Sequence, residues 1–219
     1  MINAISQDSI KAGSHFIAVE GSDGTGKTTF IEGLVRCIAI NNDLKSHVYH
    51  FRPTLLPNLG ALGEKAGVMK EDKDFTNPHR AKPVSRLSSF VRMTYYWLDY
   101  VIGVPKIIEA NRKLNDLTIF DRYIYDFLID PYRSRINLPY WLRELFSKLV
   151  MQPKIVFVLL ADEEIIYSRK QELTLEEIRR QSGELKRLSK RSKRFVVIDA
   201  SQTPQEMVDQ ALKIVEDRF

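Results

Sequence analysis

The sequence predicts an α/β fold of three layers, in which a five-stranded parallel sheet carries helices on both faces. Two observations support this prediction. Short apolar runs alternate along the 219 residues with stretches whose apolar residues recur at helical spacing. The run at 155–160 is apolar at every position, which is typical of a central parallel strand buried on both faces. The five expected strands are 15–20, 46–51, 117–121, 155–160 and 195–199.

Length and composition fit a single globular domain at 15–219, preceded by an N-terminal extension at 1–14. The chain is 44% hydrophobic and carries a formal net charge of +5. This balance suits a site for anionic phosphates but is weak evidence for nucleic acid, so we expect no nucleic-acid partner. No apolar run approaches the about 20 residues of a membrane span, so we expect no membrane partner. The single cysteine, Cys37, is read as a small buried hydrophobe, and it favours a reducing, cytoplasmic location.

The most informative stretch is 21–28, Gly-Ser-Asp-Gly-Thr-Gly-Lys-Thr. It fits the phosphate-binding loop G-x-x-x-x-G-K-[ST], and it lies between an expected strand and an expected helix. In such a loop Lys27 would reach the β- and γ-phosphates of a nucleotide, and Thr28 would ligate Mg²⁺. The alternative is a fortuitous glycine-rich turn, which the flanking pattern disfavours. The expected nucleotide-binding residues are Gly21, Ser22, Gly24, Thr25, Gly26, Lys27, Thr28 and Thr29.

Charged residues follow two other expected strands, at the carboxyl ends where open α/β sheets bind ligands. Arg52 follows the second strand and would hold a substrate phosphate bidentately, unless it is an ordinary surface arginine. Asp121 ends the third strand and would hold Mg²⁺ opposite Thr28. Arg122 follows at once and Asp126 lies a little further on. This acid, arginine and acid suit phosphate and metal binding, and a structural salt bridge is the alternative.

A long helix is expected at 84–102, and one of its faces is polar. Arg92, Tyr96 and Asp99 fall on that face, which would line a polar ligand pocket or form a solvated surface. Pro105 is expected to interrupt this helix or to start the next one.

Two further segments bear on function. The segment 55–83 contains several prolines and glycines and reads as a long loop, a type that is often functional. The charged stretch after Arg169 is either a solvated helix or a mobile lid, at about 169–187, that closes basic groups over transferring phosphates.

Two helix starts carry capping signals. Asp162 is expected to cap a helix that leads to Arg169, with two glutamates in its first turn. The stretch 203–206, Thr-Pro-Gln-Glu, opens the last helix as a capping box with proline at the first helical position.

Taken together, these residues resemble the thymidylate kinase family, within the P-loop nucleoside monophosphate kinases and their three-layer P-loop NTPase fold. Residues 16–29 resemble the first strand and phosphate loop of that family, and 121–123 match its D-R-[YH] motif. The spacing from Asp162 to Arg169 resembles the family's strand-end acid and lid arginine, and 197–200 resemble its last strand. The resemblance spans roughly residues 15 to 215.

The resemblance implies transfer of the γ-phosphoryl group of ATP, with Mg²⁺, to a nucleoside monophosphate such as dTMP. It also implies a homodimer. By this resemblance Lys27 and the loop hold the ATP phosphates, while Thr28 and Asp121 serve Mg²⁺. Arg122 would contact the acceptor phosphate. Asp23 would approach the acceptor's sugar, and Arg169 would stabilise charge on the transferring group. The residues expected to bind the acceptor are Asp23, Arg52, Arg92, Tyr96, Arg122 and Asp126.

The sequence departs from the family on the acceptor side. The family's R-E-P-G-G after the second strand is replaced at 52–56 by Arg-Pro-Thr-Leu-Leu, and its A-D-R is missing near Tyr95 and Tyr96. Two other functions therefore stay open. One is a kinase of another small acceptor, such as a deoxynucleoside or a sugar-like metabolite, and the other is a non-catalytic NTP-binding module.

Overall fold

The computed structural model describes residues 16–57 and 85–219, which fall into two compact units. The first unit comprises the described parts of 1–50, 107–123 and 153–219, and the second those of 51–106 and 124–152. Each unit is described by itself. The expected extension at 1–14 and most of the 55–83 segment lie outside the described residues. The expectation of one domain at 15–219 stays a prediction.

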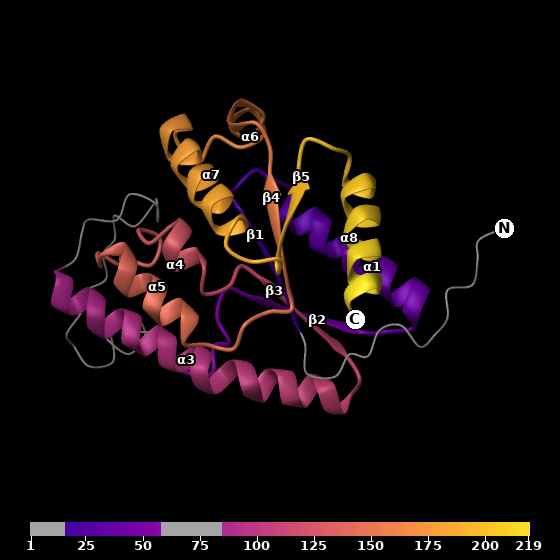
Figure 1. Cartoon of the computed structure of the whole chain (residues 1–219), viewed down its shortest axis with the longest axis horizontal. Helices are drawn as coiled ribbons and strands as arrows, with labels where there is room; N and C mark the ends of the chain where they lie inside the picture. The colour runs from indigo at the N-terminus through magenta and orange to yellow at the C-terminus, as the bar shows by residue number, and fades with distance from the viewer. Residues whose placement is uncertain (1–15, 58–84) are drawn as a thin grey trace. The chain divides into compact units, whose positions relative to one another are not determined.

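The first unit is built on a five-stranded sheet in the order β2-β3-β1-β4-β5, and every neighbouring pair is parallel (Figure 1). Ile17 of the central strand lies opposite Ile119 of β3 and Ile155 of β4. The predicted parallel sheet is thus confirmed. Its strands are β1 (Phe16–Gly21), β2 (Ser46–His50), β3 (Leu117–Asp121), β4 (Ile155–Leu160) and β5 (Phe195–Asp199).

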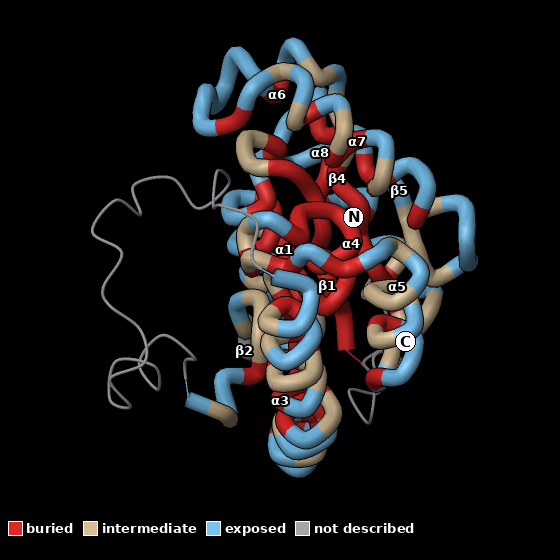
Figure 2. The backbone as a smooth tube through the Cα atoms, turned by 90° about the vertical axis from the view of Figure 1, so that its left-hand side faces the viewer, coloured by how far each residue is buried: buried red, intermediate tan, exposed pale blue. Residues whose placement is uncertain are grey.

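Helices of the first unit cover both faces of this sheet. Helices α1 (Lys27–Asn42) and α8 (Pro204–Arg218) pack side by side on one face, and α7 (Leu175–Ser189) packs against β1, β4 and β5 on the other (Figure 1). Side chains alternate along a strand, so Ile17 and Val19 join the core beneath α1 and α8. Strands β1 and β4 are buried almost throughout (Figure 2), which explains their continuous apolar sequences.

Helix α6 (Glu163–Arg169) lies between β4 and α7 in the chain. Asp162 caps it as predicted, accepting a hydrogen bond from the backbone N–H of Glu164 at 2.9 Å. The segment 169–187, predicted as a solvated helix or a lid, spans the end of α6 and most of α7. Its closure stays a prediction.

The second unit contains most of α3 (Arg86–Lys113), together with α4 (Asp126–Ile129) and α5 (Tyr140–Lys148). The expected break at Pro105 is wrong, because α3 runs through it. Pro105 lies on the exposed side of the helix, where the carbonyl that it leaves without a helical hydrogen bond can be hydrated. None of the helices in the described parts of the chain is long and apolar enough to span a membrane.

Helix α8 begins with the predicted capping box. The Thr203 hydroxyl accepts the backbone N–H of Glu206 at 3.3 Å, and the Glu206 carboxylate accepts the backbone N–H of Thr203 at 2.9 Å. Hydrogen bonds from the hydroxyl and the backbone of Thr203 lower the pKa of Glu206. A lowered pKa means that this stabilisation is present above the ordinary pKa of a glutamate and is lost on acidification.

We expect Thr203→Ala to lower the free energy of unfolding by about 1 kcal/mol at pH 7, because the first turn of α8 loses its cap. Urea denaturation measures the change. Thr203→Ser, which keeps the hydroxyl, is the matched control and should stay near the parent protein. Part of the loss should disappear at a pH low enough to protonate Glu206. An equal loss at both pH values would contradict the contribution of the Glu206 carboxylate.

Candidate active site

The phosphate loop between β1 and α1 depends on two glycines in left-handed conformations. Gly24 has φ 94° and Gly26 has φ 81°, a region that other residues rarely adopt. Thr25 closes the turn by donating its backbone N–H and its hydroxyl to the Ser22 carbonyl, at 3.3 and 2.8 Å. Gly26 is the N-cap of α1, and no side chain caps this helix. Its first N–H groups can therefore bind an anion.

Lys27 is buried, and its ammonium group lies against its own loop. Nζ donates to the carbonyls of Gly21 and Ser22, each at 2.8 Å, and lies 3.8 Å from the Asp23 carboxylate. Backbone carbonyls of the loop thus hold the positive charge in place. Thr28 is exposed in the first turn of α1.

Arg122 joins the end of β3 to the phosphate loop. The chain leaves β3 with Arg122 in a left-handed conformation, φ 68°, and its backbone N–H donates to the Val19 carbonyl at 2.9 Å. The buried guanidinium forms an ion pair with Asp23 and reaches the Gly21 carbonyl at 3.4 Å. Residues from two separate motifs therefore meet here, Asp23 and Lys27 from the phosphate loop and Arg122 from the end of β3.

Asp121, the last residue of β3, shares a hydrogen bond of 3.0 Å with Nδ1 of His50, its neighbour in register on β2. Burial opposes ionisation of this carboxyl group. The hydrogen bond with His50 and the positive charges of Lys27 and Arg122 outweigh that effect, so the pKa of Asp121 lies below its ordinary value. His50 was missed from the sequence, although it also ends a strand at the carboxyl edge of the sheet.

The residues present fit a magnesium ion held partly by phosphates. Oδ1 of Asp121 is enclosed and makes no hydrogen bond within the described chain. Throughout the part of the chain that the structure describes, no three His, Cys, Asp or Glu side chains gather as a metal site. Mg²⁺ is commonly bound by one or two protein oxygens together with substrate phosphates and water. Asp121 and the Thr28 hydroxyl supply oxygens of that kind.

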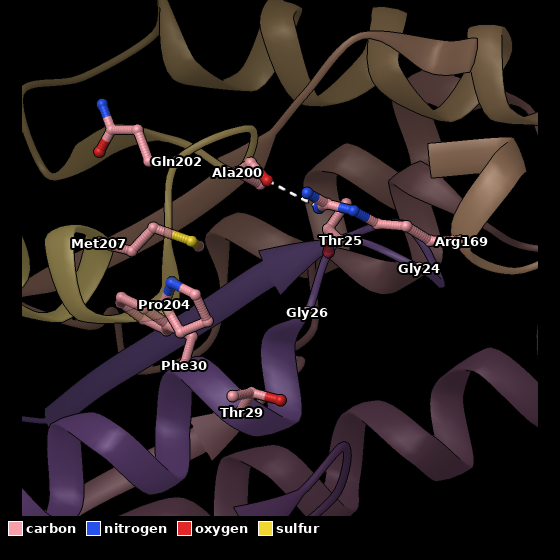
Figure 3. A pocket seen from close by; sticks show the side chains of 10 residues that line it. All are labelled: Gly24, Thr25, Gly26, Thr29, Phe30, Arg169, Ala200, Gln202, Pro204 and Met207. Carbon is pink, nitrogen blue, oxygen red and sulfur yellow. Dashed lines mark hydrogen bonds between the residues drawn. The ribbon is translucent and has the colours of Figure 1, made fainter. Parts of the chain in front are cut away.

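A cavity of about 280 Å³ opens beside the phosphate loop (Figure 3). Among the described residues that line it, Arg169 is the cationic one, and its guanidinium points toward Ala200 and donates to that carbonyl at 2.7 Å. The other walls are mainly apolar, and the sequence had indicated one of them, Pro204, only as the start of the last helix. The lining residues are Gly24, Thr25, Gly26, Thr29, Phe30, Arg169, Ala200, Gln202, Pro204 and Met207.

Two of the predicted acceptor residues of the second unit, Arg52 and Tyr96, are in contact with each other. The guanidinium of Arg52 lies 4.5 Å above the ring centroid of Tyr96. Arg92 lies one turn earlier on α3 than Tyr96, and its enclosed Nε makes no hydrogen bond with the described residues. Asp126 is fully buried at the start of α4. Arg52 and Arg122 belong to different units, so their convergence on one phosphate stays a prediction.

Comparison with known proteins identifies the family of the chain. A family model described as thymidylate kinase matches residues 19–211. Two proteins named thymidylate kinase, from Prochlorococcus marinus strains AS9601 and MIT 9312, are each 31% identical to this chain, and the alignments cover 93% of it and 96% of each relative. A third, from strain MIT 9301, is 32% identical over 163 residues, which are 72% of both proteins.

We expect Gly24→Ala to weaken ATP binding by about tenfold or more, because a left-handed alanine costs about 1–2 kcal/mol. The new Cβ would also lie 2.9 Å from the Ile166 carbonyl oxygen, so the loop must change shape. Titration calorimetry with ATP measures the effect. Gly183→Ala is the matched control, since its Cβ meets no atom within 4 Å. Unchanged ATP affinity in Gly24→Ala would contradict the assignment of the loop.

Proposed function

This chain belongs to the thymidylate kinase family, and we propose that it transfers the γ-phosphoryl group of ATP to the phosphate of dTMP. One observation carries the proposal. The phosphate loop meets Asp121 and Arg122 at the carboxyl edge of one sheet, and an ion pair joins Arg122 to Asp23 of the loop. A phosphate donor, a metal and a second phosphate need cations and oxygen ligands in this arrangement.

On the donor side, we propose that Lys27 exchanges its two carbonyl partners for the β- and γ-phosphates of ATP. The first N–H groups of α1, which no side chain caps, would bind the same phosphates. Thr28 and Asp121 would hold Mg²⁺, which neutralises charge on the phosphates when bound. The lowered pKa of Asp121 supports this role, because its neighbours favour the ionised carboxylate although burial opposes it.

We further propose that the cavity beside the loop takes the nucleoside part of ATP. It adjoins Gly24 and Gly26, and Phe30, Pro204 and Met207 give it apolar walls suited to a base. Arg169 stands at its edge. Closure of the lid at about 169–187 would move this guanidinium from the Ala200 carbonyl to the transferring phosphoryl group.

On the acceptor side, a phosphate oxygen of dTMP attacks the γ-phosphorus, the bond to the β-phosphate oxygen breaks, and ADP leaves. No covalent enzyme intermediate is required, so the protein contributes position and electrostatics. We propose that Arg122 contacts the acceptor phosphate and that Asp23 approaches its sugar. Arg52, Arg92, Tyr96 and Asp126 are proposed to complete acceptor recognition from the second unit. These substrates are small nucleotides, consistent with a cytoplasmic enzyme without a nucleic-acid partner.

An ADP-release assay with ATP and Mg²⁺ tests the function against nucleoside monophosphates, nucleosides and phosphorylated sugars. We expect turnover with dTMP above the other acceptors. Lys27→Ala should lower it by about 10²–10³-fold or more, the usual effect of removing a group that stabilises transition-state charge. Lys213→Ala, an exposed lysine of α8, is the matched control. Turnover only with a nucleoside or a sugar would favour another small-molecule kinase. ATP binding without any turnover would favour a binding module.

We also propose a homodimer that uses one face of α3. Leu87, Val91, Leu98 and Ile102 are exposed, and at about 3.6 residues per turn they fall on one side of the helix. Such an exposed apolar stripe is typical of an interaction surface.

Sedimentation analysis should show twice the chain mass, and Leu87→Glu with Val91→Glu should yield monomers, because two charges would be buried per chain. Ile40→Glu, a substitution of an equally exposed residue on α1, should leave the dimer intact. A dimer that survives the α3 substitutions would exclude this face.

A further inference from the structure

The loop that follows β2, residues 51–56, is held to α3 by one carboxylate. Asp99 is fully buried, and its Oδ2 accepts NH1 of Arg52 at 3.3 Å and the backbone N–H of Thr54 at 3.2 Å. Its Oδ1 accepts the backbone N–H of Leu56 at 2.8 Å. A single side chain of the helix thus binds three points of the loop.

This loop has a conformation that it would not adopt without support. Phe51 and Thr54 have φ values of 60° and 56°, in the left-handed region that residues other than glycine rarely adopt. The Tyr100 hydroxyl donates to the Phe51 carbonyl. Pro53 packs closely against Gly103 of α3. A Cβ atom added to Gly103 would lie 2.4 Å from the Pro53 side chain, so the helix and the loop are in close contact. Contacts with α3 therefore fix the loop.

Within this loop the guanidinium of Arg52 is held on two sides. Asp99 binds one of its nitrogens, and the ring of Tyr96 lies beneath its face at 4.5 Å. The Arg52 side chain is only 10% exposed, and the guanidinium makes no other hydrogen bond with the described residues. A guanidinium has five N–H donors in a fixed fork, so several remain for a bidentate anion such as a phosphate.

We propose that Asp99 is a positioning residue, which orients Arg52 to bind the phosphate group of a phosphate-monoester acceptor. The inference rests on the proposed function. It adds that the loop at 51–56, which departs from the family motif, keeps its phosphate contact because Asp99 holds Arg52. Because the side chain is already ordered, Arg52 loses little rotamer freedom when the acceptor binds. The buried carboxylate also keeps the cation compatible with its enclosed position.

Calorimetric binding of dTMP and of thymidine, which lacks the phosphate, separates positioning from loop structure. Asp99→Asn and Arg52→Gln should each weaken dTMP binding by about 10- to 100-fold, as expected for a lost charge-assisted hydrogen bond, and should leave thymidine binding unchanged. We compare variants by the ratio of their affinity for dTMP to their affinity for thymidine. This affinity ratio should be the same in the double variant as in Arg52→Gln alone, because the two residues act through one contact. Turnover should show a raised KM for dTMP with a smaller change in kcat.

Two controls keep the test decisive. Arg112→Gln removes an exposed arginine of the same helix that is paired with Glu109, and it should change neither affinity. Arg52→Lys keeps the positive charge but lacks the planar set of N–H donors of a guanidinium. It should also lower the ratio of dTMP affinity to thymidine affinity, because an ammonium group cannot bind a phosphate bidentately. This variant serves even if Asp99→Asn fails to fold.

Three results would overturn the inference. Equal losses for dTMP and thymidine in Asp99→Asn would assign Asp99 to loop structure alone. Unchanged dTMP binding in Arg52→Gln would remove Arg52 from phosphate recognition. Independent losses in the double variant would separate the two residues. Failure of the proposed function has a different signature, since the parent protein would then show no turnover with dTMP.

Discussion

The register between β1 and β3 is the constraint on which the site depends. Val19 lies opposite Asp121, and the Val19 carbonyl accepts the backbone N–H of Arg122. This pairing places the end of β3 beside the phosphate loop, within reach of Asp23. A slip of one residue would turn every side chain of β3 to the opposite face and would remove both Asp121 and Arg122 from the loop. The register of the sheet therefore fixes the positions of Asp121 and Arg122 beside the phosphate loop.

Charge balance stabilises the buried ionised groups of this site. Lys27 and Arg122 lie beside the Asp23 carboxylate, while Asp121 adds a second negative charge near Lys27. Two cations and two carboxylates compensate one another, which offsets the cost of burying each charge. An incoming phosphate must then compete with existing partners. Asp121 and Thr28 supply the oxygens that would hold a cation beside such a phosphate, and a cation there would add positive charge.

Local sequence signals predicted most of the first unit, and contacts between distant segments explain what they missed. Apolar runs and the glycine loop are short patterns, so the strands, α1 and the caps at Asp162 and Thr203 followed from them. His50 pairs with a residue 71 positions away, which no local pattern shows. Pro105 misled because its effect depends on which side of the helix it occupies.

The loop at 51–56 shows how a segment that departs from a family motif can still hold the one residue of the motif that is kept. Residues 52–56 lack the two glycines of R-E-P-G-G, and the backbone instead takes a left-handed turn at Thr54. The cost of that turn is offset by hydrogen bonds to Asp99, 45 residues away from Thr54. The same carboxylate also binds Arg52, the one residue of the motif that is kept. The buried side chain of Asp99 therefore couples the backbone conformation of the loop to the position of the Arg52 guanidinium. A change at Asp99 is expected to alter both.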